Sequence, residues 1–118
     1  MKKIGVLLLL LCLMAMPMAA ASLHDNAERL AGLLADTQDK ASISPAAWKT
    51  IANEATTYTG RMYLQRTPKT SDDVKNARKH VLEMHDAAMK GDAEGAKMHA
   101  GLALPYVYKV IEATAPKK

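Results

Sequence analysis

The sequence predicts an all-α protein: an up-down-up-down antiparallel four-helix bundle that follows a cleaved signal peptide. Three observations support this fold class. Apolar residues recur at alternating spacings of three and four along four segments, which is the period of a helix with one buried face. No stretch alternates with the period of two that is typical of a strand. The links between the segments are short, and short links force consecutive long helices to lie antiparallel.

Residues 1–21, which precede the four helical segments, have the parts of a secretory signal peptide. Two lysines are followed by an apolar run over residues 4–14, and small residues precede a cleavage site that we predict between Ala21 and Ser22. The apolar run is shorter than a membrane-spanning helix requires. We therefore expect residues 22–118 to form a single exported domain, periplasmic or secreted, without a transmembrane segment.

The first two helices are marked by capping residues. The first helix is predicted over Leu23–Lys40, and Ser22 lies three residues before Asp25, which is the spacing of a capping box. The second helix is predicted over Pro45–Arg66. Ser44 is a good N-cap, and proline is well tolerated at the first helical position. These signals fix the start of each helix.

The third helix is predicted over Ser71–Lys90, with Thr70 or Ser71 as its cap. Asp72 and Asp73 suit the positive end of its dipole. Gly91 is expected to end this helix in the left-handed conformation, and Asp92 to begin the next. The third and fourth helices therefore form a tight hairpin.

The fourth helix is predicted over Asp92–Thr114 and contains a proline. Pro105 cannot donate a hydrogen bond to the carbonyl of Gly101, and its ring crowds that turn. We expect a kink there or a break near Ala103.

Composition and charge exclude several classes of function. The only cysteine lies in the signal peptide, so the mature chain has no disulfide, no thiolate ligand and no covalently attached c-type haem. Two of the 16 Lys and Arg residues also lie there, which leaves 14 against 12 acidic residues and a net charge of +2. The charges are mixed along the chain, so nucleic-acid binding is not expected.

Histidines and methionines near the last hairpin turn are the candidate metal ligands. At about 100° per residue, His85 lies on the apolar face of the third helix and His99 on that of the fourth. Antiparallel pairing about the turn places His85 and His99 at the same level, so we expect them to face each other. Met84 and Met89 lie at the edges of the same face, and His80 lies at its boundary with solvent.

These residues predict a site for copper or another divalent transition metal, because imidazole binds Cu, Ni, Co and Zn and thioether favours Cu(I). His85 and His99 are the principal candidates. Alternatively, the two rings are core residues whose nitrogens are satisfied by hydrogen bonds. An H-E-x-x-H signature is absent, and no carboxylate lies at a motif spacing from either ring.

The run ARKHVLEMHDAAMKGDAEGAKMHAGLAL, residues 77–104, resembles the helical hairpins of the bacterial periplasmic small metal-binding proteins. His99-Ala100 repeats a His-Ala motif of that family, beyond a glycine turn. The resemblance implies a cysteine-free four-helix bundle that binds divalent metals, copper among them, here through His80, His85 and His99. That family is rich in histidine, whereas this chain has four.

Two functions are compatible with this sequence, and neither is enzymatic, because no phosphate loop, serine elbow or close carboxylate pair is evident. The favoured one is an interaction or accessory module of the bacterial cell envelope, with a protein partner or as a homodimer. The alternative is a periplasmic transition-metal (Cu, Ni or Zn) binding protein. The first predicts an exposed apolar patch drawn from Tyr63, Leu64, Leu82, Leu102, Leu104 and Tyr108.

Overall fold

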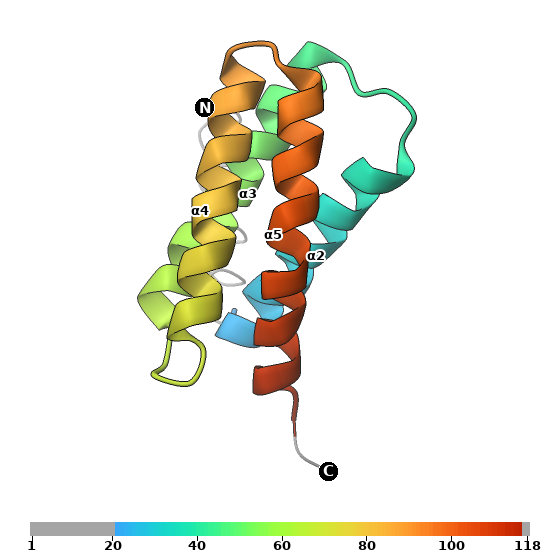
Figure 1. Ribbon diagram of the computed structural model, residues 1–118. Coiled ribbons are helices and arrows are strands. Elements are labelled where there is room, and N and C mark those ends of the chain that lie inside the picture. The colour runs from blue at the N-terminus through green and yellow to red at the C-terminus, as the bar shows by residue number, and fades with distance from the viewer. Residues whose placement is uncertain (1–20, 117–118) are drawn as a thin grey trace, which may run out of the picture.

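The computed structural model describes residues 21–116, which form four α-helices and no strand (Figure 1). The helices are α2 (Leu23–Asp39), α3 (Pro45–Gln65), α4 (Ser71–Met89) and α5 (Ala93–Thr114). Successive helices run in opposite directions, and each packs against two neighbours in the cyclic order α2, α3, α4, α5. The predicted antiparallel four-helix bundle is confirmed. The predicted signal peptide lies outside the described residues, apart from its last residue.

One core of small side chains lies between the four helices. Alanines line the inner face of every helix, and valines fill much of the space on α4 and α5. The largest fully buried side chains are Leu30, Leu34, Met62 and Met84. Burial of a side chain of this size stabilises the fold by about 2 kcal/mol. No helix among the described residues combines the length and the apolar character needed to span a membrane.

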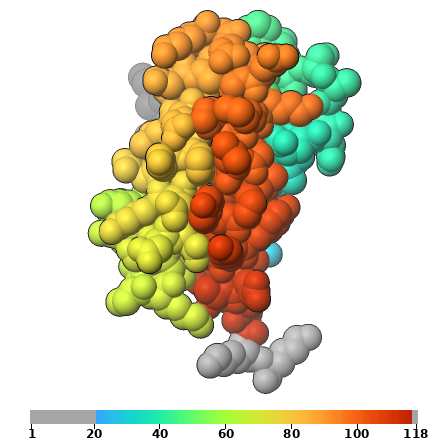
Figure 2. Space-filling model, in the orientation of Figure 1, coloured from blue at the N-terminus to red at the C-terminus, as the bar shows by residue number. Residues whose placement is uncertain are grey.

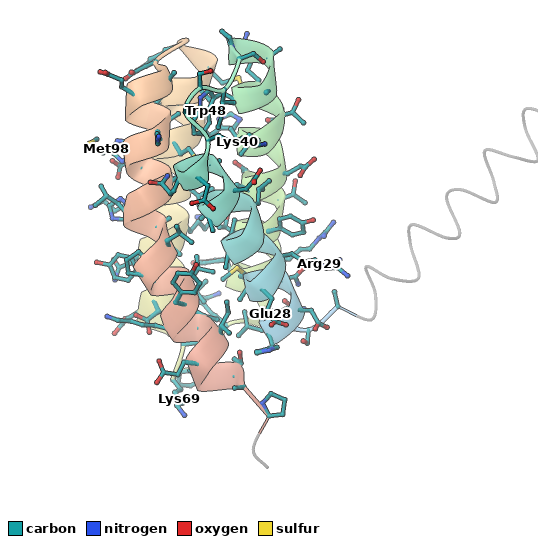
Figure 3. The ribbon with its side chains drawn as sticks, turned by 90° about the vertical axis from the view of Figure 1, so that its right-hand side faces the viewer. Glu28, Arg29, Lys40, Trp48, Lys69 and Met98 are labelled. Atoms are coloured by element: carbon teal, nitrogen blue, oxygen red, sulfur yellow. The ribbon has the colours of Figure 1, made fainter. Side chains whose placement is uncertain are left out.

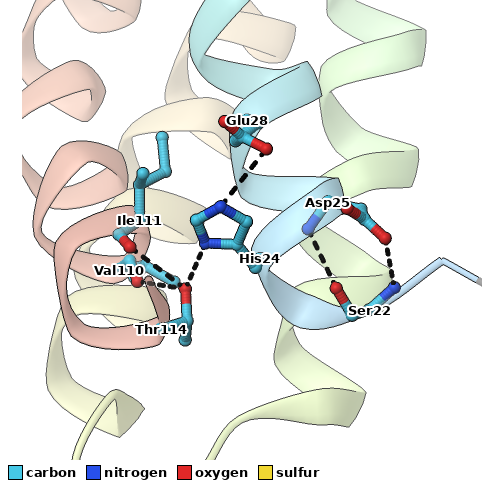
Figure 4. Close-up of polar contacts among 7 residues, drawn as sticks. All are labelled: Ser22, His24, Asp25, Glu28, Val110, Ile111 and Thr114. Carbon is cyan, nitrogen blue, oxygen red and sulfur yellow. Dashed lines mark hydrogen bonds and ion pairs between the residues drawn. The ribbon is translucent and has the colours of Figure 1, made fainter. Parts of the chain in front are cut away.

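The predicted capping box begins α2 (Figure 4). The Ser22 hydroxyl accepts a hydrogen bond from the Asp25 amide at 3.1 Å, and the Asp25 carboxylate accepts one from the Ser22 amide at 3.1 Å. Hydrogen bonding of the carboxylate by the Ser22 amide, and then by the Ser22 side chain, holds the pKa of Asp25 below its ordinary value of 3.8. Ser44 caps α3 in the predicted way, since its hydroxyl accepts a hydrogen bond from the amide of Ala47 at 3.2 Å.

The turn between α4 and α5 also follows the prediction. Gly91 has a φ of +79°, the conformation that glycine adopts without strain. The amide of Asp92 donates to the carbonyl of Ala87 at 2.8 Å, and the Asp92 carboxylate caps α5 by accepting from the amide of Gly95 at 2.9 Å. At the turn between α3 and α4, Thr70 is the N-cap residue of α4, but its side chain makes no hydrogen bond that caps that helix.

The predicted break near Ala103 is wrong, because α5 continues without interruption through Pro105. Ala103 is fully buried in the core, whereas Pro105 is exposed. Gly101, whose carbonyl loses its partner, is half-buried next to the side chain of Gln38. Packing of the inner face holds the helix together across the proline.

Polar contacts join α2 to α5 at one end of the bundle, and Trp48 lies at the other end (Figure 3). At one end, His24 Nδ1 lies 2.9 Å from the Thr114 hydroxyl oxygen and its Nε2 lies 3.3 Å from Glu28, so the start of α2 is joined to the end of α5 (Figure 4). Trp48 and Lys40 lie at the opposite end (Figure 3). Trp48 is buried close to the α4–α5 turn.

Candidate metal centre

The α4–α5 seam is the line along which these two neighbouring helices meet, and it faces the viewer in Figures 1 and 2. His80 and Glu83 on α4 and His99 on α5 each present one ligand atom there, and the three atoms lie within 4.8 Å of one another. His80 and Glu83 are three residues apart, so they share one face of α4. The hairpin brings His99 to them. We call these three residues the metal-ligand trio.

Two ring nitrogens of the trio are buried without a hydrogen-bond partner: Nδ1 of His80 and Nδ1 of His99. His99 Nδ1 lies 3.3 Å from a carboxylate oxygen of Glu83, which is an ion-pair distance, but the contact lacks the direction of a hydrogen bond. The side chains of His99 and Glu83 are 19% and 41% exposed. Buried polar atoms without a partner are rare in folded proteins, and here two of them lie in neighbouring rings, one beside a carboxylate.

Stacked rings fix the orientation of the histidines. The ring centroids of His80 and His99 are 6.1 Å apart, with an angle of 23° between the ring planes. His80 also stacks on Tyr106, at 5.9 Å and 16°. Lys109 Nζ lies 5.5 Å from the centroid of the Tyr106 ring. Side chains held by such packing lose little freedom when they bind an ion.

Glu83 and His99 of the trio line a shallow depression on the seam that is open to solvent. Acidic side chains predominate over basic ones in its lining, so its potential attracts cations. The lining residues are Glu83, Asp86, Ala87, Lys90, Asp92 and His99.

The spacing of the trio fits a transition-metal ion after a small adjustment. Zinc–nitrogen and zinc–oxygen bonds are about 2.0–2.2 Å long, so two ligands of a tetrahedral ion lie about 3.4 Å apart. The three ligand atoms lie within 4.8 Å of one another, so they must approach by roughly 1 Å to share one ion. Two imidazoles and one carboxylate suit Cu(II), Ni(II) and Zn(II), and they leave a further position open to solvent.

The predicted facing of His85 and His99 is wrong. His85 Nε2 lies 3.0 Å from the side-chain oxygen of Asn53 on α3. Five residues separate His80 from His85, which is about 140° around the helix. The two histidines therefore lie on opposite flanks of α4, one against α5 and the other against α3.

The two predicted methionine ligands differ in exposure, and their role stays a prediction. Met84 is fully buried in the core, and Met89 is 40% exposed near the end of α4. Of the three predicted histidines, the structure brings His80 and His99 together. It adds Glu83, which the sequence reasoning missed although it lies one helical turn after His80 and level with His99 in the predicted hairpin.

Comparisons with models of protein families, with curated proteins and with solved structures found no match. The resemblance of residues 77–104 to the small metal-binding proteins stays a prediction.

Proposed function

We propose that this protein binds a divalent transition-metal ion between α4 and α5, with His80, Glu83 and His99 as its ligands. One observation carries the proposal: three ligand atoms from two helices lie within 4.8 Å of one another, and the two buried Nδ1 atoms have no hydrogen-bond partner. A coordinated ion satisfies such nitrogens, since a neutral imidazole nitrogen is a strong ligand for these metals. That the protein is not an enzyme stays a prediction.

The ligand set favours some ions over others. Copper(II) binds nitrogen and oxygen ligands more tightly than nickel(II) or zinc(II) does. Copper(I) prefers thioether or thiolate ligands, and neither methionine predicted from the sequence belongs to the trio. We therefore expect the affinity to decrease from Cu(II) to Ni(II) and Zn(II), with Cu(I) bound most weakly.

Equilibrium competition with a chromophoric chelator tests this proposal. Residues 22–118 contain all four helices and every core residue except Ala21, so this chain is the one to use. We expect His80→Ala, Glu83→Gln and His99→Ala each to lower the affinity for Cu(II) and Zn(II) at least about tenfold, because each removes one of three protein ligands.

The matched controls are the two histidines outside the trio. His24→Ala and His85→Ala remove the same side chain from other faces of the bundle, and we expect both to leave the affinity unchanged. Equal losses in the trio and control variants would contradict the proposed site.

The interaction module favoured on the sequence also stays a prediction, as does a homodimer. Leu64, Leu82, Leu102 and Tyr108 are exposed, whereas Tyr63 and Leu104 are half-buried and pack against the core. The exposed side chains come from three helices: α3, α4 and α5. Leu64 lies in a stretch with three basic residues and no acidic one, residues 55–71.

A further inference from the structure

Leu64, near the end of α3, is the most exposed large apolar side chain among the described residues. It is 84% exposed, far more than any other leucine of the bundle. Over residues 55–71 the chain has three basic residues, Arg61, Arg66 and Lys69, and no acidic one. A protruding leucine therefore lies in a basic stretch.

Tyr63, the residue before this leucine on α3, contacts two arginines. The guanidinium carbon of Arg66 lies 3.9 Å from the Tyr63 ring centroid, and that of Arg78 on α4 lies 4.9 Å from it. Among residues 21–116, neither arginine has a carboxylate within ion-pair distance. A guanidinium that lies over an aromatic ring keeps its N–H groups free, because they point outward in the plane of the guanidinium. These N–H groups can donate hydrogen bonds to phosphate oxygens. Among the described residues, one of these N–H groups makes a hydrogen bond, since Arg66 Nη1 donates to the Tyr63 carbonyl at 2.6 Å.

The nearest acidic residues on α4 point elsewhere. Asp72 and Asp73 lie about 120° and 140° around the helix from Arg78, at about 100° per residue. The face that Arg78 presents towards α3 is therefore free of their charge. Lys69, in the loop between α3 and α4, lies at the same end of the bundle, far from Trp48 (Figure 3).

We propose that this basic end surface, made of Tyr63, Leu64, Arg66, Lys69 and Arg78, docks on an anionic phospholipid surface. A leucine that is 84% exposed projects from the protein, so it can enter a layer of headgroups and reach the acyl boundary. Arg66, Arg78 and Lys69 then meet lipid phosphates, and the tyrosine ring lies at headgroup level. This inference is independent of metal binding, because the surface lies on the α3–α4 side and the trio on the α4–α5 seam.

Co-sedimentation with vesicles tests the proposal, using residues 22–118 with a chelator present so that metal plays no part. We expect binding to phosphatidylcholine vesicles that contain phosphatidylglycerol, little binding to pure phosphatidylcholine, and weakening by salt. Each cationic side chain near an anionic surface strengthens binding about fivefold, so Arg66→Gln/Arg78→Gln should lower the partition coefficient roughly 30-fold. Leu64→Ala should lower it several-fold without changing the salt dependence.

Matched substitutions at other places serve as controls. Lys49→Gln/Lys90→Gln removes two exposed charges at the opposite end, and Leu102→Ala shortens an exposed leucine on α5. Circular dichroism checks that every variant is folded. Binding that ignores phosphatidylglycerol, or that falls equally in the controls, would overturn the proposal. The absence of vesicle binding would also overturn the proposal. This holds even if the same surface binds an acidic protein instead.

Discussion

At the scale of single residues, two imidazole nitrogens decide what the seam can bind. A buried polar atom without a partner costs about 1–3 kcal/mol, and His80 and His99 each bury one such Nδ1. A proton on His99 would gain the nearby carboxylate of Glu83 as an ion-pair partner. A metal ion satisfies His80, Glu83 and His99 together. These three residues are therefore the ligands that we propose for a single cation.

Asp25 makes the stability of the protein depend on pH in acid. Hydrogen bonds from the Ser22 amide and hydroxyl keep its pKa below the ordinary value of 3.8, so the carboxylate is favoured in the folded state. This contribution is fully present above pH 3.8 and is lost as the pH falls through the lower folded pKa. We expect Asp25→Asn to be less stable than the wild type at neutral pH, and the difference to vanish in strong acid. Urea unfolding at a series of pH values measures it, and a constant difference would contradict this role.

The residues of the candidate site were only partly predictable from the sequence. The inner position of His99 and its level in the hairpin followed from helical periodicity and from the turn. The sequence did not indicate which flank of α4 packs against α5. Helical periodicity locates the centre of an apolar face, but it does not give the order in which the helices are arranged around the core. The sequence therefore predicted His85 opposite His99, where the structure has Glu83. The spacing of His80 and Glu83, three residues apart on one helix, was the signal that could have corrected this prediction.

At the scale of elements, the α4–α5 hairpin positions the trio, and Gly91 sets its geometry. Gly91 has a positive φ, whereas Gly32 lies inside α2 with no atom within 4 Å of an added Cβ. We expect Gly91→Ala to destabilise the protein by about 1 kcal/mol, because an L side chain strains the left-handed conformation. Gly32→Ala should stabilise it by about 0.5–1 kcal/mol, because alanine is the better helix former. Chemical denaturation gives both values, and the same sign for both would be inconsistent with this turn.

The helices themselves were predictable to within about one residue at each end. Their starts carry local signals, such as the Ser44-Pro45 cap and Asp92, which depend on neighbouring backbone groups and not on the rest of the fold. The effect of Pro105 was not predictable in this way. Its consequence depends on whether the proline faces the core or solvent, and it is exposed on the outer face of α5.

At the scale of the whole molecule, one core joins the helix pair of the trio to the rest of the bundle. An ion bound to α4 and α5 should therefore stabilise all four helices in one cooperative transition. With free metal at 100 times its Kd, the stabilisation is about 2.7 kcal/mol, which for a domain of this size raises Tm by about 10–20 °C. Thermal melting with and without Cu(II) or Zn(II) measures the shift. A shift retained in His80→Ala/His99→Ala would show that the ion binds elsewhere.

We propose that His80 and His99 coordinate an ion that His24 and His85 do not touch. The most direct measurement is the ¹⁵N chemical shifts of the four histidine rings, recorded before and after one equivalent of Zn(II) is added. We predict large shifts of one nitrogen in each of His80 and His99, with His24 and His85 unchanged because they contact Thr114 and Asn53. Shifts at His85 with none at His80, or no shift in any ring, would contradict a metal centre on the α4–α5 seam.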